Sequence, residues 1–223
     1  MADYDKKICY ICGKENADSD DHVPPKNLFL KKYRDIGDDL ITIPAHKSCN
    51  KLFEKDDEYF RFCLSIPSYW ESDKARELWD EKMKDQLHRA ESQGFRSYLL
   101  KSMKPIDLYS ESGIYLGKGD VALLDAKRMD VVVERIARGI FYKKTKNILP
   151  LAWLMEVQML HPVDGRQQMS RFRVEAKLSS IGNGIFKYFW QPTIEDQRIG
   201  LFWLIFFDSV YFWVFAGLQD KRL

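Results

Sequence analysis

Apolar and polar positions follow different periods in different parts of the chain, and each period predicts an element. Residues 40–43 have the β-branched character of a strand, and residues 21–23 form a second short strand that two prolines end. From residue 50 onward, apolar side chains recur at the spacing of one helical face, which predicts a helix that Pro67 ends. The apolar positions of this helix are Leu52, Phe53, Phe60 and Leu64.

The middle of the chain predicts two helices separated by an irregular stretch. Residues 72–93 are rich in Lys, Glu, Ala, Leu and Gln, and their pattern is that of an amphipathic helix. Glycines and Pro105 interrupt residues 94–124, which predicts a connection with one or two short strands. Residues 125–142 give the clearest later helix, because Asp125 can cap its first turn and its apolar residues form one stripe.

From Pro150 onward the pattern is typical of strands. Residues 154–160 fit a strand or a helix. Apolar residues occupy every second position of 172–178, and the Gly-Asn-Gly sequence at 182–184 is a signal for a hairpin turn. Residues 185–190 then form the partner strand.

Two strongly apolar runs, 201–207 and 210–216, flank Asp208 and Ser209. A membrane span is the alternative explanation. Each run alone is too short to cross a bilayer, and joining them would place Asp208 near its centre at a cost of about 3 kcal/mol. We therefore expect a buried hairpin with Asp208 at or near its turn, and no membrane partner.

Cysteine and histidine occur in the first fifty residues at the spacing of a zinc site. Cys9 and Cys12 form a C-x-x-C pair, and His46 and Cys49 form an H-x-x-C pair. A pair with a two-residue gap places both ligands on one tight turn, and two such pairs complete a tetrahedron around zinc. The sequence predicts a structural Cys3His zinc site, with Cys63 outside it.

Three further polar residues lie near these pairs although a closed zinc site needs none of them. Asp21 and His22 lie between the pairs, and Asn50 directly follows Cys49. If zinc joins the pairs, a carboxylate, an imidazole and an amide oxygen come together. Oxygen ligands suit a hard divalent cation such as Mg²⁺, and an adjacent imidazole can deprotonate water. Glu54, one helical turn after Asn50, is either a further contact of the cation or its water, or an ordinary solvated residue.

With these residues the sequence resembles the HNH, or ββα-metal, endonuclease family. It most resembles the branch with C-x-x-C, then (D/E)-H-x-x-P, then C-x-x-C followed at once by His or Asn. The resemblance covers roughly residues 5–62. It implies that His22 is the general base and that Asp21 and Asn50 bind a catalytic Mg²⁺ or Mn²⁺, in addition to the structural zinc.

The chain departs from the family pattern at two positions. His46 stands where the family usually has the third cysteine of the site, which is a sound exchange of one zinc ligand for another. The middle asparagine of the family is missing, and Asp38 or Asp39 is the nearest polar substitute. Two other roles for His22 stay open at this point, a buried structural histidine or a zinc ligand in place of His46.

These elements together predict an α+β fold. We expect an N-terminal zinc-stabilised ββα-metal module at residues 1–66 and an α+β C-terminal domain at residues 67–223. The second domain would contain a helical middle and an antiparallel sheet packed on the helix at 125–142. With 223 residues, of which 45% are hydrophobic, the chain can bury a sizeable core in one large or two smaller domains.

The function expected from this combination is metal-dependent hydrolysis of DNA phosphodiester bonds by an HNH-type endonuclease, in a defence or toxin role. The alternative is a non-catalytic zinc module that docks nucleic acid or protein. Net charge favours neither, because it is +2 overall and residues 1–60 carry ten basic and thirteen acidic side chains. The basic residues of 125–146 are either a solvated face or a phosphate-contacting surface.

The residues of the C-terminal domain do not reveal its role. It could bind substrate, act as a sensor, form a homo-oligomer or bind a regulatory partner. The first residues, Met-Ala-Asp-Tyr-Asp-Lys-Lys, have no apolar core of the kind that a signal peptide needs. Three cysteines assigned to zinc also fit a reducing compartment. We therefore expect a cytoplasmic protein.

Overall fold

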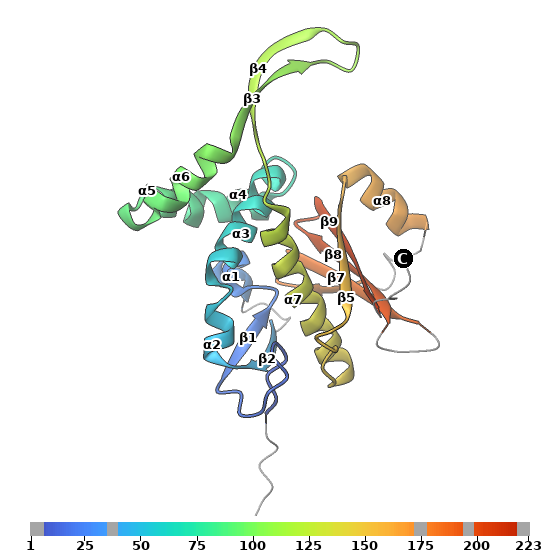
Figure 1. The fold of residues 1–223 in the computed structure, drawn as a ribbon. Coiled ribbons are helices and arrows are strands. Elements are labelled where there is room, and N and C mark those ends of the chain that lie inside the picture. The colour runs from blue at the N-terminus through green and yellow to red at the C-terminus, as the bar shows by residue number, and fades with distance from the viewer. Residues whose placement is uncertain (1–6, 35–39, 172–177, 194–198, 218–223) are drawn as a thin grey trace, which may run out of the picture.

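The computed structural model describes residues 7–34, 40–171, 178–193 and 199–217, and it has the predicted α+β fold (Figure 1). Within these residues the strands form three antiparallel sheets. Two of them are hairpins, β1–β2 and β3–β4, and the third has five strands in the order β5-β9-β8-β7-β6. Helix α7 runs between the N-terminal segment and the five-stranded sheet (Figure 1).

The elements follow one another along the chain. They are β1 (Ser19–Val23), the 3-10 helix η1 (Lys26–Leu28), α1 (Lys31–Arg34), β2 (Ile41–Ala45), α2 (Lys47–Lys51), α3 (Glu54–Ser68), α4 (Asp73–Leu78), the π-helical η2 (Trp79–Met83), α5 (Lys84–His88), the 3-10 helix η3 (Ala90–Ser92), α6 (Gln93–Ser102), β3 (Met103–Tyr109), β4 (Tyr115–Ala122), α7 (Ala126–Thr145), β5 (Leu154–Leu160), α8 (Pro162–Arg171), β6 (Ser179–Ile181), β7 (Phe186–Pro192), β8 (Gly200–Phe206) and β9 (Val210–Gly217).

The N-terminal segment confirms both predicted strands and corrects the helix that follows them. Strands β1 and β2 pair antiparallel, with His22 opposite Thr42. The expected helix from residue 50 is two helices, because the chain turns at Leu52 and Phe53. Phe53 N donates to Asn50 O at 3.1 Å, which is the tighter i−3 pattern. Leu52 was expected on the apolar side, but it is 76% exposed.

The middle of the chain is more helical than the sequence predicts. The single helix expected at 72–93 is interrupted, because a π-helical turn, η2, separates α4 from α5. Helix α6 begins at Gln93, and residues 94–102 of this helix were expected within a connection. The one or two short strands predicted after it are β3 and β4, a hairpin that projects from the body of the molecule (Figure 1).

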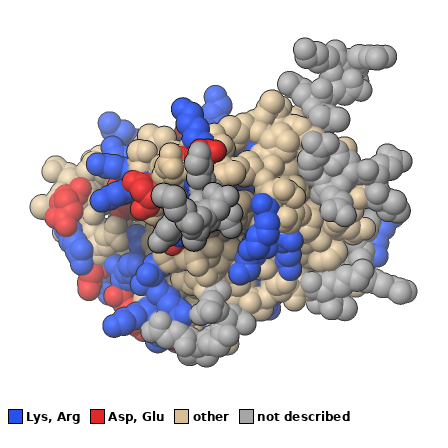
Figure 2. All heavy atoms as spheres, turned by 90° about the horizontal axis from the view of Figure 1, so that it is seen from below, with Lys and Arg blue, Asp and Glu red and all other residues tan. Residues whose placement is uncertain are grey.

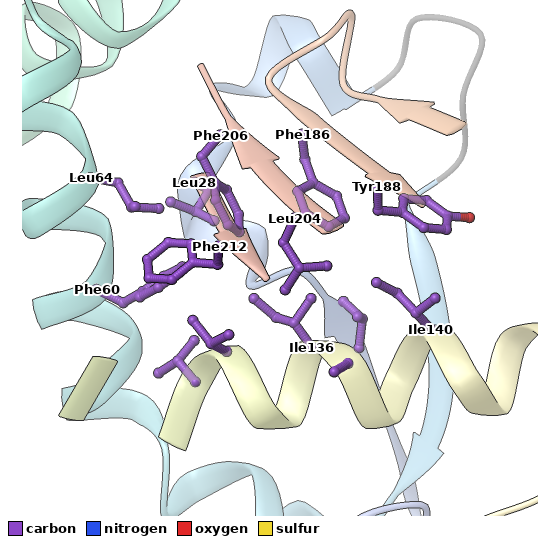
Figure 3. Packing of buried hydrophobic residues seen from close by; sticks show 14 of the residues in the cluster. Leu28, Phe60, Leu64, Ile136, Ile140, Phe186, Tyr188, Leu204, Phe206 and Phe212 are labelled. Carbon is purple, nitrogen blue, oxygen red and sulfur yellow. The ribbon is translucent and has the colours of Figure 1, made fainter. Parts of the chain in front are cut away.

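Helix α7 confirms the clearest helix prediction. The Asp125 side chain accepts a hydrogen bond from Arg128 N at 3.4 Å, so it caps the first turn as expected. The helix is about one turn longer than predicted and ends at Thr145, and the residue that follows, Lys146, has a positive φ of 60°. Its apolar stripe packs against the five-stranded sheet (Figure 3).

The C-terminal strands also confirm their predictions. Residues 154–160, which fitted a strand or a helix, form strand β5. The hairpin of β8 and β9 is buried, and Asp208 lies in its turn with a φ of 58°. Residues 182–184 form the predicted turn between β6 and β7. Most of the alternating stretch 172–178 lies outside the described residues.

One hydrophobic core contains side chains from both sides of residue 66 (Figure 3). Phe60 of α3 contacts Phe206 and Phe212 of the C-terminal sheet, with ring centroids 5.3 and 6.1 Å apart. The division into two domains at residue 66 stays a prediction. Among the described helices, none is both long enough and apolar enough to cross a membrane.

Helix α7 packs tightly against Val23 of β1 at Gly139. A Cβ added there would lie 2.5 Å from Val23 Cγ2, well inside normal contact distance. Val23 directly follows His22, so this contact sets the distance between α7 and the strand that carries the histidine. The absence of a side chain at position 139 is therefore a packing requirement.

We predict that Gly139→Ala lowers the free energy of unfolding. Alanine gains up to about 1 kcal/mol from helix propensity, but overpacking against Val23 costs about 1–3 kcal/mol. Gly94→Ala in α6 is the matched control, because its added Cβ meets no atom within 4 Å. Urea unfolding of both variants checks this, and a Gly139→Ala protein as stable as the control would contradict it.

Candidate metal centre and adjoining cleft

The two predicted ligand pairs come together next to strand β2. Tyr10, inside the first pair, donates its backbone N–H to Pro44 O at 3.1 Å. Gly13 N donates to Cys9 O at 2.8 Å and closes the turn, with a φ of 72° that favours glycine. The second pair begins directly after β2, because His46 precedes the first residue of α2.

The ligand atoms of Cys9, Cys12, His46 and Cys49 all lie within 4.8 Å of one another. Nδ1 of His46 is 3.3 Å from Cys12 Sγ and 3.8 Å from Cys49 Sγ. A tetrahedral site with zinc–sulfur bonds of about 2.3 Å separates neighbouring ligand atoms by about 3.8 Å. The four predicted residues therefore form a cluster whose donors and spacing fit a structural zinc ion.

A hydrogen bond outside the cluster fixes the orientation of His46. Its Nε2 lies 3.0 Å from Glu15 O, and donation to this carbonyl leaves Nδ1 unprotonated and directed at the sulfur atoms. The backbone N–H of His46 also donates to Cys9 Sγ at 3.4 Å. His46, and not His22, therefore stands with the three cysteines.

A cleft of about 450 Å³ lies beside this cluster. It contains all four residues that the sequence predicts for a second metal or for catalysis, namely Asp21, His22, Asn50 and Glu54. Its lining residues are Asp20, Asp21, His22, Pro25, Lys26, Asn27, Lys47, Asn50, Lys51, Glu54, Asp57 and Arg135. The β1 strand, the α2–α3 segment and α7 together shape this cleft.

Asp21 is buried, with 8% of its surface exposed, and both of its carboxylate oxygens are engaged. Oδ2 accepts a hydrogen bond from the Tyr10 hydroxyl, and Oδ1 accepts one from the backbone N–H of His22 at 2.8 Å. Burial and the Asp21 charge raise the pKa of Tyr10 well above its usual range, so the hydroxyl remains a donor. Each carboxylate oxygen has two lone pairs, so these bonds leave acceptor capacity.

The His22 side chain is half-buried and lines the cleft. Burial lowers the pKa of His22, and the positive charge of Lys26 lowers it further. The ring is therefore neutral at neutral pH. A neutral imidazole has one nitrogen that can accept a proton from water.

The side-chain oxygen of Asn50 has no partner among the residues that the structure describes. Its Nδ2 donates to Ser19 Oγ at 3.3 Å and to Asp20 O at 3.4 Å, which fixes the amide plane. Its Oδ1 is buried and accepts no hydrogen bond from the described residues. A buried acceptor without a donor is costly, and a cation is one partner that would satisfy it.

Sequence reasoning missed the Arg135 guanidinium, which is 4% exposed and lies between two carboxylates. It donates to Asp57 Oδ1, and its Nη1 lies 3.7 Å from Asp21 Oδ2. Burial raises the pKa of Asp57 to about 6, although Arg135 opposes this shift. The helical period could have predicted that Arg135 is buried. Arg135 is three residues after Val132 and four before Gly139, and both of these lie on the buried face of α7.

The cleft has a basic rim that the sequence located only in part. Lys26 follows the two prolines that end β1, and the exposed Lys47 and Lys51 of α2 lie on the same cleft. Figure 2 views the molecule from the end that carries the N-terminal segment, and lysine and arginine side chains stand out there among acidic ones. By contrast, Arg128 and Arg138 of α7 are partly buried, and they donate to Asp56 and to the Leu149 carbonyl.

Another amide in the cleft is Asn27. Its Nδ2 donates to the backbone O of Asp57 at 3.0 Å, and its Oδ1 is buried without a partner among the described residues. It links η1 to α3 across the cleft. Asp38 and Asp39, the substitutes expected for the missing asparagine of the family, lie outside the described residues.

Comparisons with protein-family models, with curated proteins and with solved structures gave no significant match to this chain. The resemblance to HNH endonucleases therefore depends on the motif residues themselves and on their arrangement in the cleft.

We predict one zinc ion per chain, lost in Cys12→Ser and Cys49→Ser. Removing one thiolate opens the tetrahedron, and zinc binding is coupled to the folding of the segment around it. Cys63→Ala is the matched control, because Cys63 is buried in the core and is no member of the cluster. Metal analysis by mass spectrometry checks this, and a zinc-free folded native protein prepared without chelator would contradict it.

We further predict that Arg135→Met lowers the free energy of unfolding by about 3–5 kcal/mol, because it leaves two buried carboxylates without their cation. Adding Asp57→Asn to this variant should restore part of the loss by removing one of the uncompensated charges. Guanidinium unfolding measures both. An Arg135→Met protein of native stability would show that the buried pair is energetically neutral.

Proposed function

We propose that this protein is a metal-dependent endonuclease of the HNH type that hydrolyses DNA phosphodiester bonds. The observation that supports the proposal is that a single cleft contains Asp21, His22 and Asn50 beside a Cys3His cluster. The cleft contains the Asp21 carboxylate and the buried Oδ1 of Asn50, which has no partner among the described residues, and oxygen donors of these kinds suit a hard cation.

In this proposal the residues of the cleft have separate tasks. His22 accepts a proton from the attacking water at its unprotonated ring nitrogen, since its ring is neutral and faces the cleft. Asp21 and Asn50 hold Mg²⁺ or Mn²⁺, which supplies Lewis-acid stabilisation of the scissile phosphate and of the leaving oxygen. Glu54, exposed on the same cleft, orients water or adds a ligand.

The basic rim supplies attraction for the DNA backbone. Lys26, Lys47 and Lys51 line the cleft, so a phosphate that enters it meets three ammonium groups. Such contacts position a duplex without reading its sequence. The zinc ion would contribute folding energy and no chemistry, because four protein ligands leave it no open position.

A second candidate is a docking module without catalytic activity. The observation that favours it is the condition of Asp21, which is buried, hydrogen-bonded to Tyr10 and next to Arg135. These contacts give Asp21 a structural task that needs no cation. In this alternative the lysine rim binds DNA, but no bond is cleaved.

The experiment that separates these functions is cleavage of supercoiled plasmid by the purified full chain with Mg²⁺ or Mn²⁺. We predict that His22→Ala cuts about a hundredfold to ten-thousandfold more slowly, because the general base is lost. Asn50→Ala should lose cleavage through weaker cation binding, so extra Mn²⁺ restores part of it. Extra Mn²⁺ should not rescue His22→Ala.

His88→Ala is the matched control, since His88 is exposed on α5 and lies outside the cleft. It should cut at the native rate, and all variants should keep native zinc content and DNA affinity. DNA binding without cleavage by the native protein with either cation would favour the docking module. Loss of zinc in His22→Ala would remove the proposed base and overturn the nuclease assignment.

A further inference from the structure

The β3–β4 hairpin is a projecting arm with little core of its own (Figure 1). Its strand residues are exposed or half-buried throughout. Tyr115 and Leu116 at the start of β4, and Ile114 just before it, are large and apolar, and they are 52%, 65% and 64% exposed. An isolated two-stranded hairpin is marginally stable in water, and contiguous exposed apolar side chains mark an interaction surface.

One edge of this arm is open for pairing. Among the described residues, β4 pairs with β3 and with no other strand. An open edge offers unpaired backbone N–H and C=O groups to another strand. Pro105 lies in β3 and weakens pairing through that strand, whereas β4 contains no proline.

The charges on β4 specify what can pair there. Gly119 lies between Lys118 and Asp120, so reversing the strand about Gly119 exchanges a cation for an anion. Within the arm, Lys118 already faces Asp107 on β3, and Asp120 faces the uncharged Pro105. The free edge of β4 is therefore complementary in charge to an antiparallel copy of itself.

We propose that two copies of this chain form a dimer by antiparallel pairing of their β4 edges, with the twofold axis at Gly119. This register places Lys118 of each copy opposite Asp120 of the other. Two opposite-charge pairs then flank the axis, and two glycines meet on it. Moving the axis by one residue would place Lys118 opposite Lys118, or Asp120 opposite Asp120, which is unfavourable.

The regular part of β4 ends toward the tip at a bulge, because Leu108 pairs with Gly117 whereas Tyr109 pairs with Tyr115. The register between two copies therefore runs from Gly117 to Val121 of each strand, and Gly117 of one copy lies opposite Val121 of the other. The twofold makes the contacts on either side of the axis identical.

This inference is independent of the proposed function, and the test is a reciprocal charge exchange. Lys118→Asp alone sets two anions against each other in a homodimer, and Asp120→Lys alone sets two cations against each other. Each variant should dimerise about tenfold or more weakly than the native chain. A mixture of the two variants restores both opposite-charge pairs and should dimerise like the native chain.

Sedimentation velocity over a wide range of concentrations measures this on the full chain. Lys104→Asp is the matched control, because it makes the same charge change on β3, away from the β4 edge. It should dimerise like the native chain, and restored dimerisation in the mixture shows that the single variants are folded. Any of three results would overturn the proposal: a monomeric native chain, unaffected dimers in either single variant, or a mixture that stays monomeric. A monomeric native chain would indicate that the arm binds a different protein.

Discussion

The buried ion pairs of Arg135 are the interaction on which the candidate site depends. From α7, this guanidinium reaches Asp57 on α3 and Asp21 on β1. It also stacks on the Phe53 ring, with 4.6 Å between the guanidinium carbon and the ring centroid. Three elements from distant parts of the sequence therefore meet at one charge. Because that charge is removed from water, geometry and hydrogen bonding have to compensate it fully.

Two constraints hold strand β1, which carries His22, from opposite sides. The Cys3His cluster fixes the turn around Tyr10 and the start of α2, and Tyr10 in turn holds the Asp21 carboxylate. On the other side, α7 contacts β1 through Gly139 and Val23. The cysteine–histidine cluster and the packing of α7 thus act on the strand of His22 from two sides without sharing a residue. A side chain held in this way is pre-organised for a defined task.

Much of this arrangement is visible in the sequence, because its signals are local. The two ligand pairs, the cap at Asp125 and the turn at Asp208 each depend on a few neighbouring residues. The break between α2 and α3 at Leu52 is not visible in the sequence, because a leucine at this position fits the apolar face of one continuous helix. In the structure Leu52 is exposed. Arg135 was missed because its partners are 78 and 114 residues away, and no local pattern shows that two carboxylates will meet it. A charged residue on a helix usually lies at the surface, whereas this fold buries Arg135.

The core that crosses residue 66 has a consequence for the portability of the motif. A fragment that ends there would retain the metal ligands, His22 and Asn50, but it would lack α7 and the sheet. Asp21 would lose its ion pair with Arg135, and Phe60 would lose its contacts with the rings of Phe206 and Phe212. In this fold the motif residues therefore have contacts that come from beyond residue 66. The smallest transferable unit of the motif includes a helix that begins sixty residues further along the chain.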